Sequence, residues 1–269
     1  MSTTTAPRAS YSPLSRFTDI VRSEFCKFRT VRSTRWAILA GVGFNIIAAV
    51  LLGIFLPRAL GTHDQATIDS TRLSLGGTHI SQVAFGLLGV LVITSEYGSG
   101  MIRATLSAVP QRRSMLAAKA MVLTVAALVI GLVSTFVAYF AFQLFLPSGS
   151  LMRTSLSDPG VLRAVAGAGL YLGVIALFGF GLGAILRFSA GAVAVLLGLL
   201  FVPPLILSLL PQSWQNTVGG YFPLEAGFSM ISVQHVPNTL QPWAGFGVLC
   251  LYALVAVWAG FFLINHRDA

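Results

Sequence analysis

The sequence predicts an all-α membrane protein with six transmembrane helices, and three observations support this fold class. Of 269 residues, 55% are hydrophobic and only 9% are charged, whereas a soluble domain carries roughly 25% charged residues. The mean hydropathy is +0.82. Six apolar runs reach the length of about twenty residues that crosses a bilayer core of about 30 Å. These properties exclude a soluble globular domain.

The chain before the first apolar run divides into two parts. Residues 1–12 are rich in Ser and Thr, and we expect them to be disordered. Residues 13–35 have the pattern of an amphipathic helix that lies in the headgroup region of the membrane. Its apolar face carries Phe17, Ile20, Val21, Phe25, Phe28 and Val31, and its edges and far side carry Arg16, Asp19, Arg22, Lys27 and Arg29.

Glu24 breaks the pattern of this helix, because it falls in the middle of the apolar face. A carboxylate is costly there unless it is paired. One interpretation is that the helix rolls and exposes Glu24 to solvent. The other is that Glu24 binds a basic residue on a neighbouring element and fixes the helix in place.

The six apolar runs predict the following membrane spans: 36–56, 79–97, 117–146, 161–186, 190–210 and 242–264. The fourth is rich in glycine, which allows helix backbones to approach closely. A short polar tail follows at 265–269.

A basic segment, residues 95–119, separates the second and third spans. After Glu96 and Gly100, a short helical pattern places Met101, Ile102, Thr105, Leu106 and Val109 on one arc, with Arg103 and Ser107 opposite. Pro110 ends that pattern, and Arg112, Arg113 and Lys119 lead into the next span. We expect a small helix that contacts a partner outside the membrane.

The distribution of Lys and Arg predicts the orientation. With the N-terminus in the cytoplasm, thirteen basic residues lie on the cytoplasmic side and four on the other; those four are Arg58, Arg72, Arg153 and Arg163. Both termini and the basic segment are therefore expected to be cytoplasmic. Positive charge beside apolar runs serves topology and anionic lipid, so the net charge of +9 does not indicate nucleic acid.

The connection between the fifth and sixth spans, 211–241, contains no Lys or Arg and is expected to be external. Its aromatic residues favour short re-entrant helices that close the external end of a pathway, with a plain interfacial aromatic belt as the alternative. The candidate gate residues are Tyr221, Phe222, Glu225 and Phe228.

No catalytic or metal-ligating pattern is present. The chain lacks a phosphate-binding G-x-x-x-x-G-K-[ST] loop, and its four histidines and two cysteines are scattered. Ionisable residues are nearly absent from the spans, so the chain lacks the buried acid or base that usually couples transport to an ion gradient. Asn45, Gln82 and Gln143 are candidate contacts along a substrate path, although such residues more often join helices by hydrogen bonds.

The chain resembles the membrane subunits (permeases) of ABC exporters of the ABC type-2 class, from Phe17 to Ile264. The resemblance depends on Ser23-Glu24-x-x-Lys27-x-Arg29-Thr30-x-Arg32-Ser33, on Glu96-x-x-x-Gly100-x-x-Arg103 with Pro110, Arg112 or Arg113 and Lys119, and on the aromatic segment after the fifth span. It implies an elbow helix at the N-terminus, a cytoplasmic coupling helix and external re-entrant helices. A large external domain and a fused ATPase, which larger members carry, are missing from this sequence.

The resemblance also implies partners in the cytoplasmic membrane. A second permease subunit, identical or different, would pair with this one, and two separate ATPase subunits would bind ATP and Mg. The residues that the resemblance places at the ATPase contact are Glu96, Gly100, Met101, Arg103, Leu106, Arg112 and Arg113. The chain itself would hold no cofactor. The alternatives are an ATP-independent secondary carrier and a non-transporting scaffold or sensor subunit.

Overall fold

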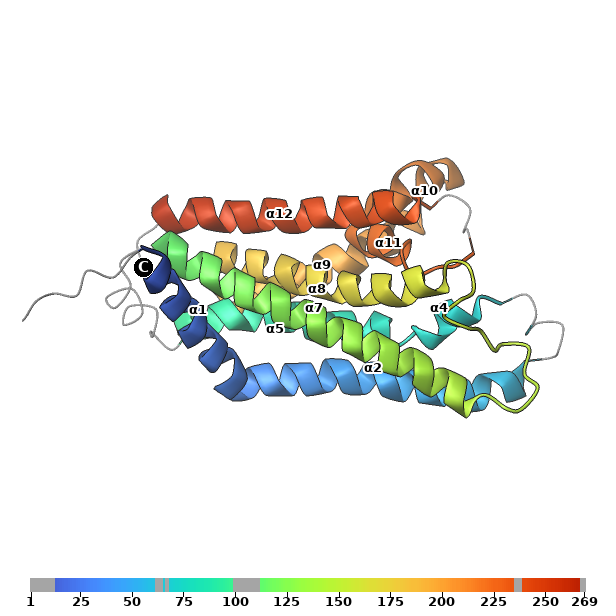
Figure 1. Ribbon diagram of the computed structural model, residues 1–269. Coiled ribbons are helices and arrows are strands. Elements are labelled where there is room, and N and C mark those ends of the chain that lie inside the picture. Colours follow the sequence, from blue (N-terminus) through green and yellow to red (C-terminus); the bar gives the residue numbers. More distant parts are fainter. Residues whose placement is uncertain (1–12, 61–64, 66–67, 99–111, 235–238, 267–269) are drawn as a thin grey trace, which may run out of the picture.

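The computed structural model describes residues 13–60, 65, 68–98, 112–234 and 239–266. In these residues the structure is helical and contains no strand. Residues 1–12 and most of the predicted coupling helix, 99–111, lie outside the described part. The long helices run side by side, α1 lies obliquely across one end of them, and the start of α1 and the end of α12 lie at that same end of the bundle (Figure 1).

Six helices are long and apolar enough to cross a membrane, as the sequence predicts. They are α2 (Arg32–Ala59), α5 (Thr78–Gly98), α7 (Arg112–Phe145), α8 (Val161–Leu186), α9 (Ser189–Leu207) and α12 (Pro242–His266). The predicted spans agree with these bounds to within a few residues, and the fourth matches α8 at both ends. We call the end that carries α1 the basic end, and the other the opposite end.

Helix α8 lies at the centre of the bundle and packs against α5, α7, α9 and α12. In an apolar 18-residue stretch of α8, 72% of the stretch is buried, whereas in the corresponding stretch of α9 only 17% is buried. Its glycines make this possible: a Cβ added at Gly179 would overlap the carbonyl oxygen of Gly86 in α5, and one added at Gly181 would lie 2.7 Å from atoms of Ala256 in α12. The glycine-rich span is therefore the close-packing element that its composition indicates.

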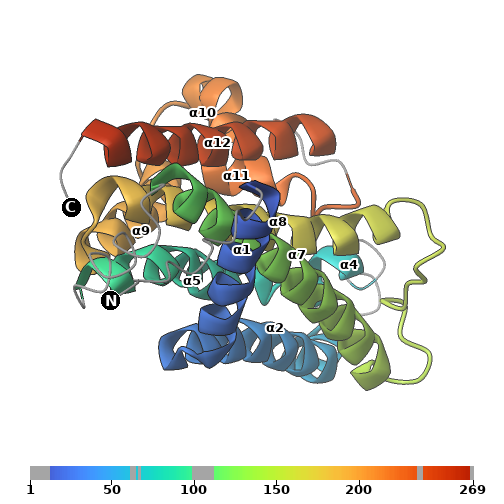
Figure 2. The same ribbon diagram turned by 60° about the vertical axis from the view of Figure 1, so that its left-hand side comes forward.

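Helix α1 (Pro13–Thr30) crosses α7 at the basic end and is not collinear with α2 (Figures 1 and 2). The prediction of one helix over 13–35 is wrong at its C-terminal part. Val31 is extended, with φ −68° and ψ 126°, and residues 32–35 form the first turn of α2. This single extended residue lets α1 turn away from α2 and lie against other helices.

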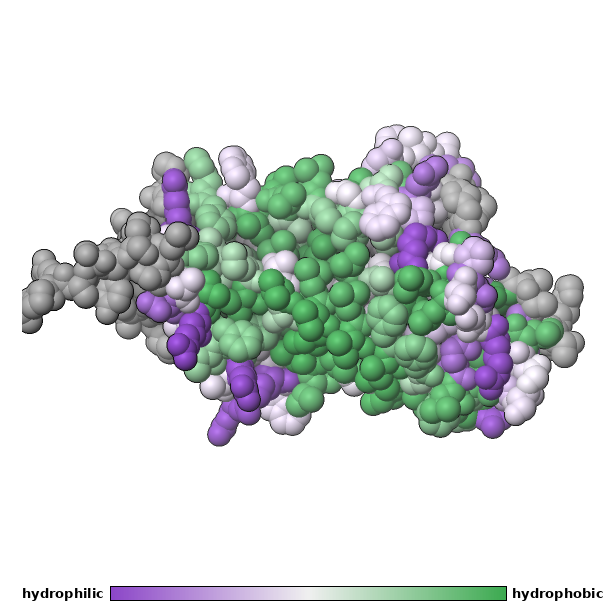
Figure 3. Space-filling model, viewed as in Figure 1, coloured by the Kyte–Doolittle hydropathy of each residue, from purple (hydrophilic) through white to green (hydrophobic). Residues whose placement is uncertain are grey.

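Short helices cap the opposite end of the bundle (Figure 1). They are α4 (Ser70–Ser74), α10 (Gln212–Val218), the 3-10 helix η1 (Gly219–Tyr221) and α11 (Pro223–Phe228). On the face shown in Figure 3, hydrophobic side chains predominate between the two ends, and hydrophilic side chains gather toward the ends. This is the distribution expected of a multi-pass membrane protein.

Candidate functional site

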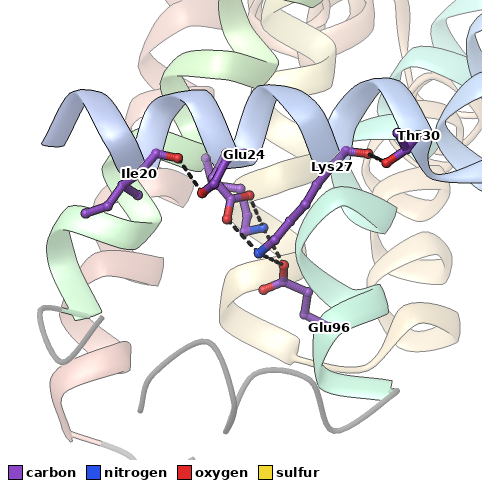
Figure 4. Close-up of polar contacts among 7 residues, drawn as sticks. Ile20, Glu24, Lys27, Thr30 and Glu96 are labelled. Atoms are coloured by element: carbon purple, nitrogen blue, oxygen red, sulfur yellow. Dashed lines mark hydrogen bonds and ion pairs between the residues drawn. The ribbon is translucent and has the colours of Figure 1, made fainter. Parts of the chain in front are cut away.

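Two carboxylates and two ammonium groups meet at the basic end, where α1 crosses the end of α5 and the beginning of α7. Glu24 and Lys27 lie one turn apart on α1 and point toward Glu96 of α5 (Figure 4). Lys119 reaches the same point from α7. We call Glu24, Lys27, Glu96 and Lys119 the charge cluster.

The four groups form a closed ring of alternating charge. Lys119 Nζ donates to Glu24 Oε2 at 2.5 Å and to Glu96 Oε1 at 2.8 Å. Lys27 Nζ donates to Glu24 Oε1 at 2.9 Å and to Glu96 Oε1 at 3.1 Å. Each lysine thus bridges both carboxylates, and the ring carries no net charge.

Three members of the ring are withdrawn from solvent. The side chains of Glu24 and Lys119 are each 4% exposed and that of Glu96 is 7% exposed, whereas that of Lys27 is 34% exposed. Ions are stable at such positions only when they are paired with good geometry. Burial acts to lower the pKa of Lys27, but its hydrogen bonds to Glu24 and Glu96 and their negative charges outweigh that effect, and its pKa is raised. Lys27 is therefore charged at neutral pH.

The pairing confirms one of the two interpretations of Glu24. Its carboxylate does not turn to solvent; it binds Lys119, 95 residues away in the sequence, and so joins α1 to α7. The sequence pattern shows that Glu24 needs a partner but does not identify it.

The ring can divide into two neutral halves. Glu24 and Lys27 form an ion pair within α1, and Glu96 and Lys119 form another between α5 and α7. If α1 moved away, each half would keep one internal pair, and no charge would be left alone. A cluster with this arrangement can serve as a joint that opens and closes.

The charge cluster lines a cavity of about 270 Å³ whose other walls include Phe28 of α1, Val31, Thr34 of α2, Val92 and Ser95 of α5, and Val122 of α7. Among the described residues there is no group of three or more His, Cys, Asp or Glu that could hold a metal ion. The arrangement holds α1, α5 and α7 together.

Only three of the seven residues predicted to contact an ATPase lie in the described part of the chain. Gly100, Met101, Arg103 and Leu106 lie outside the described residues. Arg112 begins α7, and Arg113 beside it is exposed. Glu96 faces the interior of the charge cluster, where its carboxylate binds lysines of this chain. Its contact with a partner stays a prediction.

The predicted residues of α1 occupy two sides of the helix. Glu24 is buried, whereas Phe25 is 54% exposed. Phe17 and Phe28 are half-buried, and Arg29 is exposed. The apolar face of α1 is therefore only partly covered by the bundle.

The three predicted substrate-path residues form hydrogen bonds within the bundle. Asn45 Nδ2 donates to Ser134 Oγ at 3.0 Å and joins α2 to α7. Gln82 of α5 accepts a hydrogen bond from the hydroxyl of Tyr171 in α8. Gln143 Nε2 donates to Thr154 Oγ1 at 2.7 Å. The contacts of Asn45 and Gln82 join helices, the role that the sequence analysis considered more common, whereas Gln143 holds the connection between α7 and α8.

The predicted gate residues do not share one surface. Phe228 is buried, with its ring centroid 4.0 Å from that of His79 and 5.1 Å from that of Tyr171. Tyr221 is exposed, and Phe222 and Glu225 are half-buried. Phe228 thus belongs to the packed core at the opposite end, and the gate stays a prediction for the others.

Two charged residues at the opposite end were not singled out as site residues from the sequence. Asp69 Oδ2 accepts hydrogen bonds from the backbone N–H of Val233 at 2.8 Å and of Gln234 at 3.2 Å. Arg163 donates to the carbonyls of Met230 at 3.2 Å and of Ser232 at 2.9 Å. We call Asp69 and Arg163 the opposite-end clasp. Their partners are backbone groups, which every residue carries, so the sequence does not indicate these contacts.

Comparison with known proteins does not assign the chain to a family. No protein-family model matches it, and no curated protein is similar enough to match.

Proposed function

We propose that this chain is the membrane-spanning subunit of an ABC exporter in the cytoplasmic membrane, powered by separate ATPase subunits. The observation that carries the proposal is the position of the charge cluster. Glu96 and Lys119 lie near the two ends of the basic segment 95–119, and both bind α1. A force applied to that segment from the cytoplasm would reach α1, α5 and α7 through one joint.

Within this proposal, α1 is the elbow helix, and residues 99–111 form the coupling helix. The division of the charge cluster into two neutral pairs supports a movable contact between them. The short helices α10, η1 and α11 are the external re-entrant segment. Rigid helices that move about such joints are a common way to transmit a conformational change.

The composition of the bundle interior supports the proposal that the energy for transport comes from a separate subunit. Among the described residues, the ions withdrawn from solvent lie in the charge cluster at one end, and the membrane-depth polar residues Asn45 and Gln82 are used in helix contacts. A gradient-driven carrier generally places an ionisable group on its pathway. The apolar surfaces favour a hydrophobic or amphipathic substrate, such as a drug, a lipid or a lipid-linked molecule.

The exposed faces of α2, α9 and α12 carry large apolar side chains that lipid or a second subunit must cover. A second permease subunit, identical or different, fits this requirement. Pairing of two subunits around a central pathway follows from the resemblance to ABC type-2 exporters.

The proposal is tested by purifying the tagged chain from its own host in mild detergent and measuring ATP hydrolysis in the preparation. We expect an ATPase to co-purify, and Arg103→Glu to abolish stimulation of its activity by substrate while membrane insertion is retained. Arg58→Glu, the same change at the opposite end, is the matched control and should behave as the wild type.

Three results would contradict the proposal. Normal stimulation in Arg103→Glu would remove this residue from coupling. Transport by vesicles that contain the chain alone, equal with and without ATP, would identify a secondary carrier. A preparation with neither ATPase nor transport would indicate a scaffold or sensor subunit.

A further inference from the structure

An apolar groove of about 890 Å³ runs between α1 and α7, outside the charge cluster. One wall is a stripe of α1 residues at helical spacing and the other is a stripe of α7, with Ile38 of α2 between them. The apolar lining consists of Phe17, Val21, Phe25, Phe28, Ile38, Met121, Val122, Val125, Ala126, Val129 and Ile130. Both stripes are open to the surroundings: Phe25 is 54% exposed and Val125 is 58% exposed.

The charged residues that line the groove are all arginines. Arg22 and Arg29 lie two turns apart on α1, and Arg35 lies near the start of α2. Among the described residues, no carboxylate lines the groove. Three exposed guanidinium groups therefore border an apolar channel at the membrane surface, and guanidinium binds phosphate with paired hydrogen bonds.

The apolar stripe of α7 continues past the groove. Val133 and Val137 extend the row of exposed residues toward the opposite end. Residues 121–137 span about 24 Å at 1.5 Å per residue, which is most of a bilayer core of about 30 Å. An occupant with an anionic head and a long apolar tail fits both parts of this surface.

We propose that the groove binds one anionic phospholipid, with its phosphate at Arg22, Arg29 and Arg35 and an acyl chain between α1 and α7. This site does not depend on the proposed transport function. Phe28 and Val122 line both the groove and the cavity of the charge cluster. A bound lipid therefore packs against the joint itself and holds α1 in the position that closes the ring.

Other occupants lack complementary charge. A second copy that pairs through the same surface would bring six arginines together without an acid, because a two-fold interface matches a patch with itself. Residues 1–12 of this chain contain Arg8 and no acidic residue. Phosphatidylglycerol and similar lipids supply both the negative charge and the apolar chain.

The test is native mass spectrometry of the full chain in detergent with dioleoylphosphatidylglycerol or dioleoylphosphatidylcholine, which share their acyl chains. Each basic residue near an anionic surface strengthens binding roughly fivefold. We expect the wild type to prefer the anionic lipid by tenfold or more, and Arg22→Gln/Arg29→Gln/Arg35→Gln to reduce the preference below twofold. Arg32→Gln/Arg58→Gln/Arg72→Gln makes the same change in net charge outside the groove and should keep the preference.

A second variant tests the groove independently of charge. Val125→Trp places a large ring in the channel, and we expect retention of both lipids to fall; Leu144→Trp, on the exposed face of α7 outside the groove, is its control. The proposal fails if the wild type shows no preference, if both triple variants lose it equally, or if Val125→Trp retains lipid normally. It also fails if Val125→Trp separates a dimer and leaves the lipid preference intact, because a second copy would then cover the groove.

Discussion

The two ends of the bundle are both held by charged side chains, but these bind different kinds of partner. At the basic end, four side chains from α1, α5 and α7 bind one another in a neutral ring. At the opposite end, Asp69 and Arg163 bind backbone groups of residues 230–234. The first arrangement joins three helices, and the second anchors a connecting segment.

This difference has a mechanical consequence. When α1 leaves, the charge cluster separates into two neutral ion pairs, so neither half holds an isolated charge. The opposite-end clasp has no such division, because the N–H groups of Val233 and Gln234 would lose their partner and Asp69 would keep only the N–H of Arg72. The basic end is therefore suited to movement and the opposite end to anchoring.

Lys119→Met removes the most buried ammonium group of the charge cluster, and we expect it to cause the largest loss of stability. Methionine preserves the shape but leaves two buried carboxylates with Lys27 alone. Removal of one partner from a buried ion pair costs about 3–5 kcal/mol. The free energy of unfolding, measured by SDS titration of the detergent-solubilised protein, should fall by that amount.

A second substitution checks whether charge balance is the cause. In Lys119→Met/Glu96→Gln the ring keeps the neutral Glu24–Lys27 pair, so we expect it to recover more than half of the lost stability. If the double variant is no more stable than Lys119→Met, the cluster does not divide into independent neutral pairs.

The sequence predicts the six membrane helices because a bilayer requires about twenty consecutive apolar residues, and that requirement is visible along the chain. It places the break between α1 and α2 at 35/36, a few residues after its position in the structure. Val31 adopts an extended conformation there, although no Gly or Pro marks the position. Helix α1 packs against α7, a tertiary contact that local sequence does not specify.

For the charge cluster, the sequence predicts that Glu24 needs a partner, but it does not predict which residue that partner is. A carboxylate in the apolar face of an amphipathic helix indicates that Glu24 needs a partner, and the structure supplies Lys119. The identity of that partner depends on how helices far apart in the sequence pack. Lys119 also lies close to a stretch of arginines, so its own pattern indicates topology rather than an internal ion pair.

Asp69→Ala tests the anchoring end, and we expect an intermediate effect. The carboxylate accepts hydrogen bonds from the backbone N–H groups of Arg72, Val233 and Gln234, and it caps α4. Its loss should cost about 2 kcal/mol. Hydrogen exchange at Val233 and Gln234 should accelerate, while exchange in α1 stays unchanged. Faster exchange in α1 as well would show that the two ends are coupled.

Lys27→Met should have the smallest effect, about 1 kcal/mol or less, because the side chain is 34% exposed and solvent screens what it leaves behind. Lys119 still bridges both carboxylates in this variant. The pKa of Lys27 is raised above 10.5, so its contribution is complete below that pH and is lost only as the pH rises through the raised value. The difference in unfolding free energy between the wild type and Lys27→Met should therefore be constant across neutral pH. If Lys27→Met lowered the free energy of unfolding as much as Lys119→Met does, the exposed and buried lysines would be equivalent. Burial would then not determine how strongly each lysine stabilises the charge cluster.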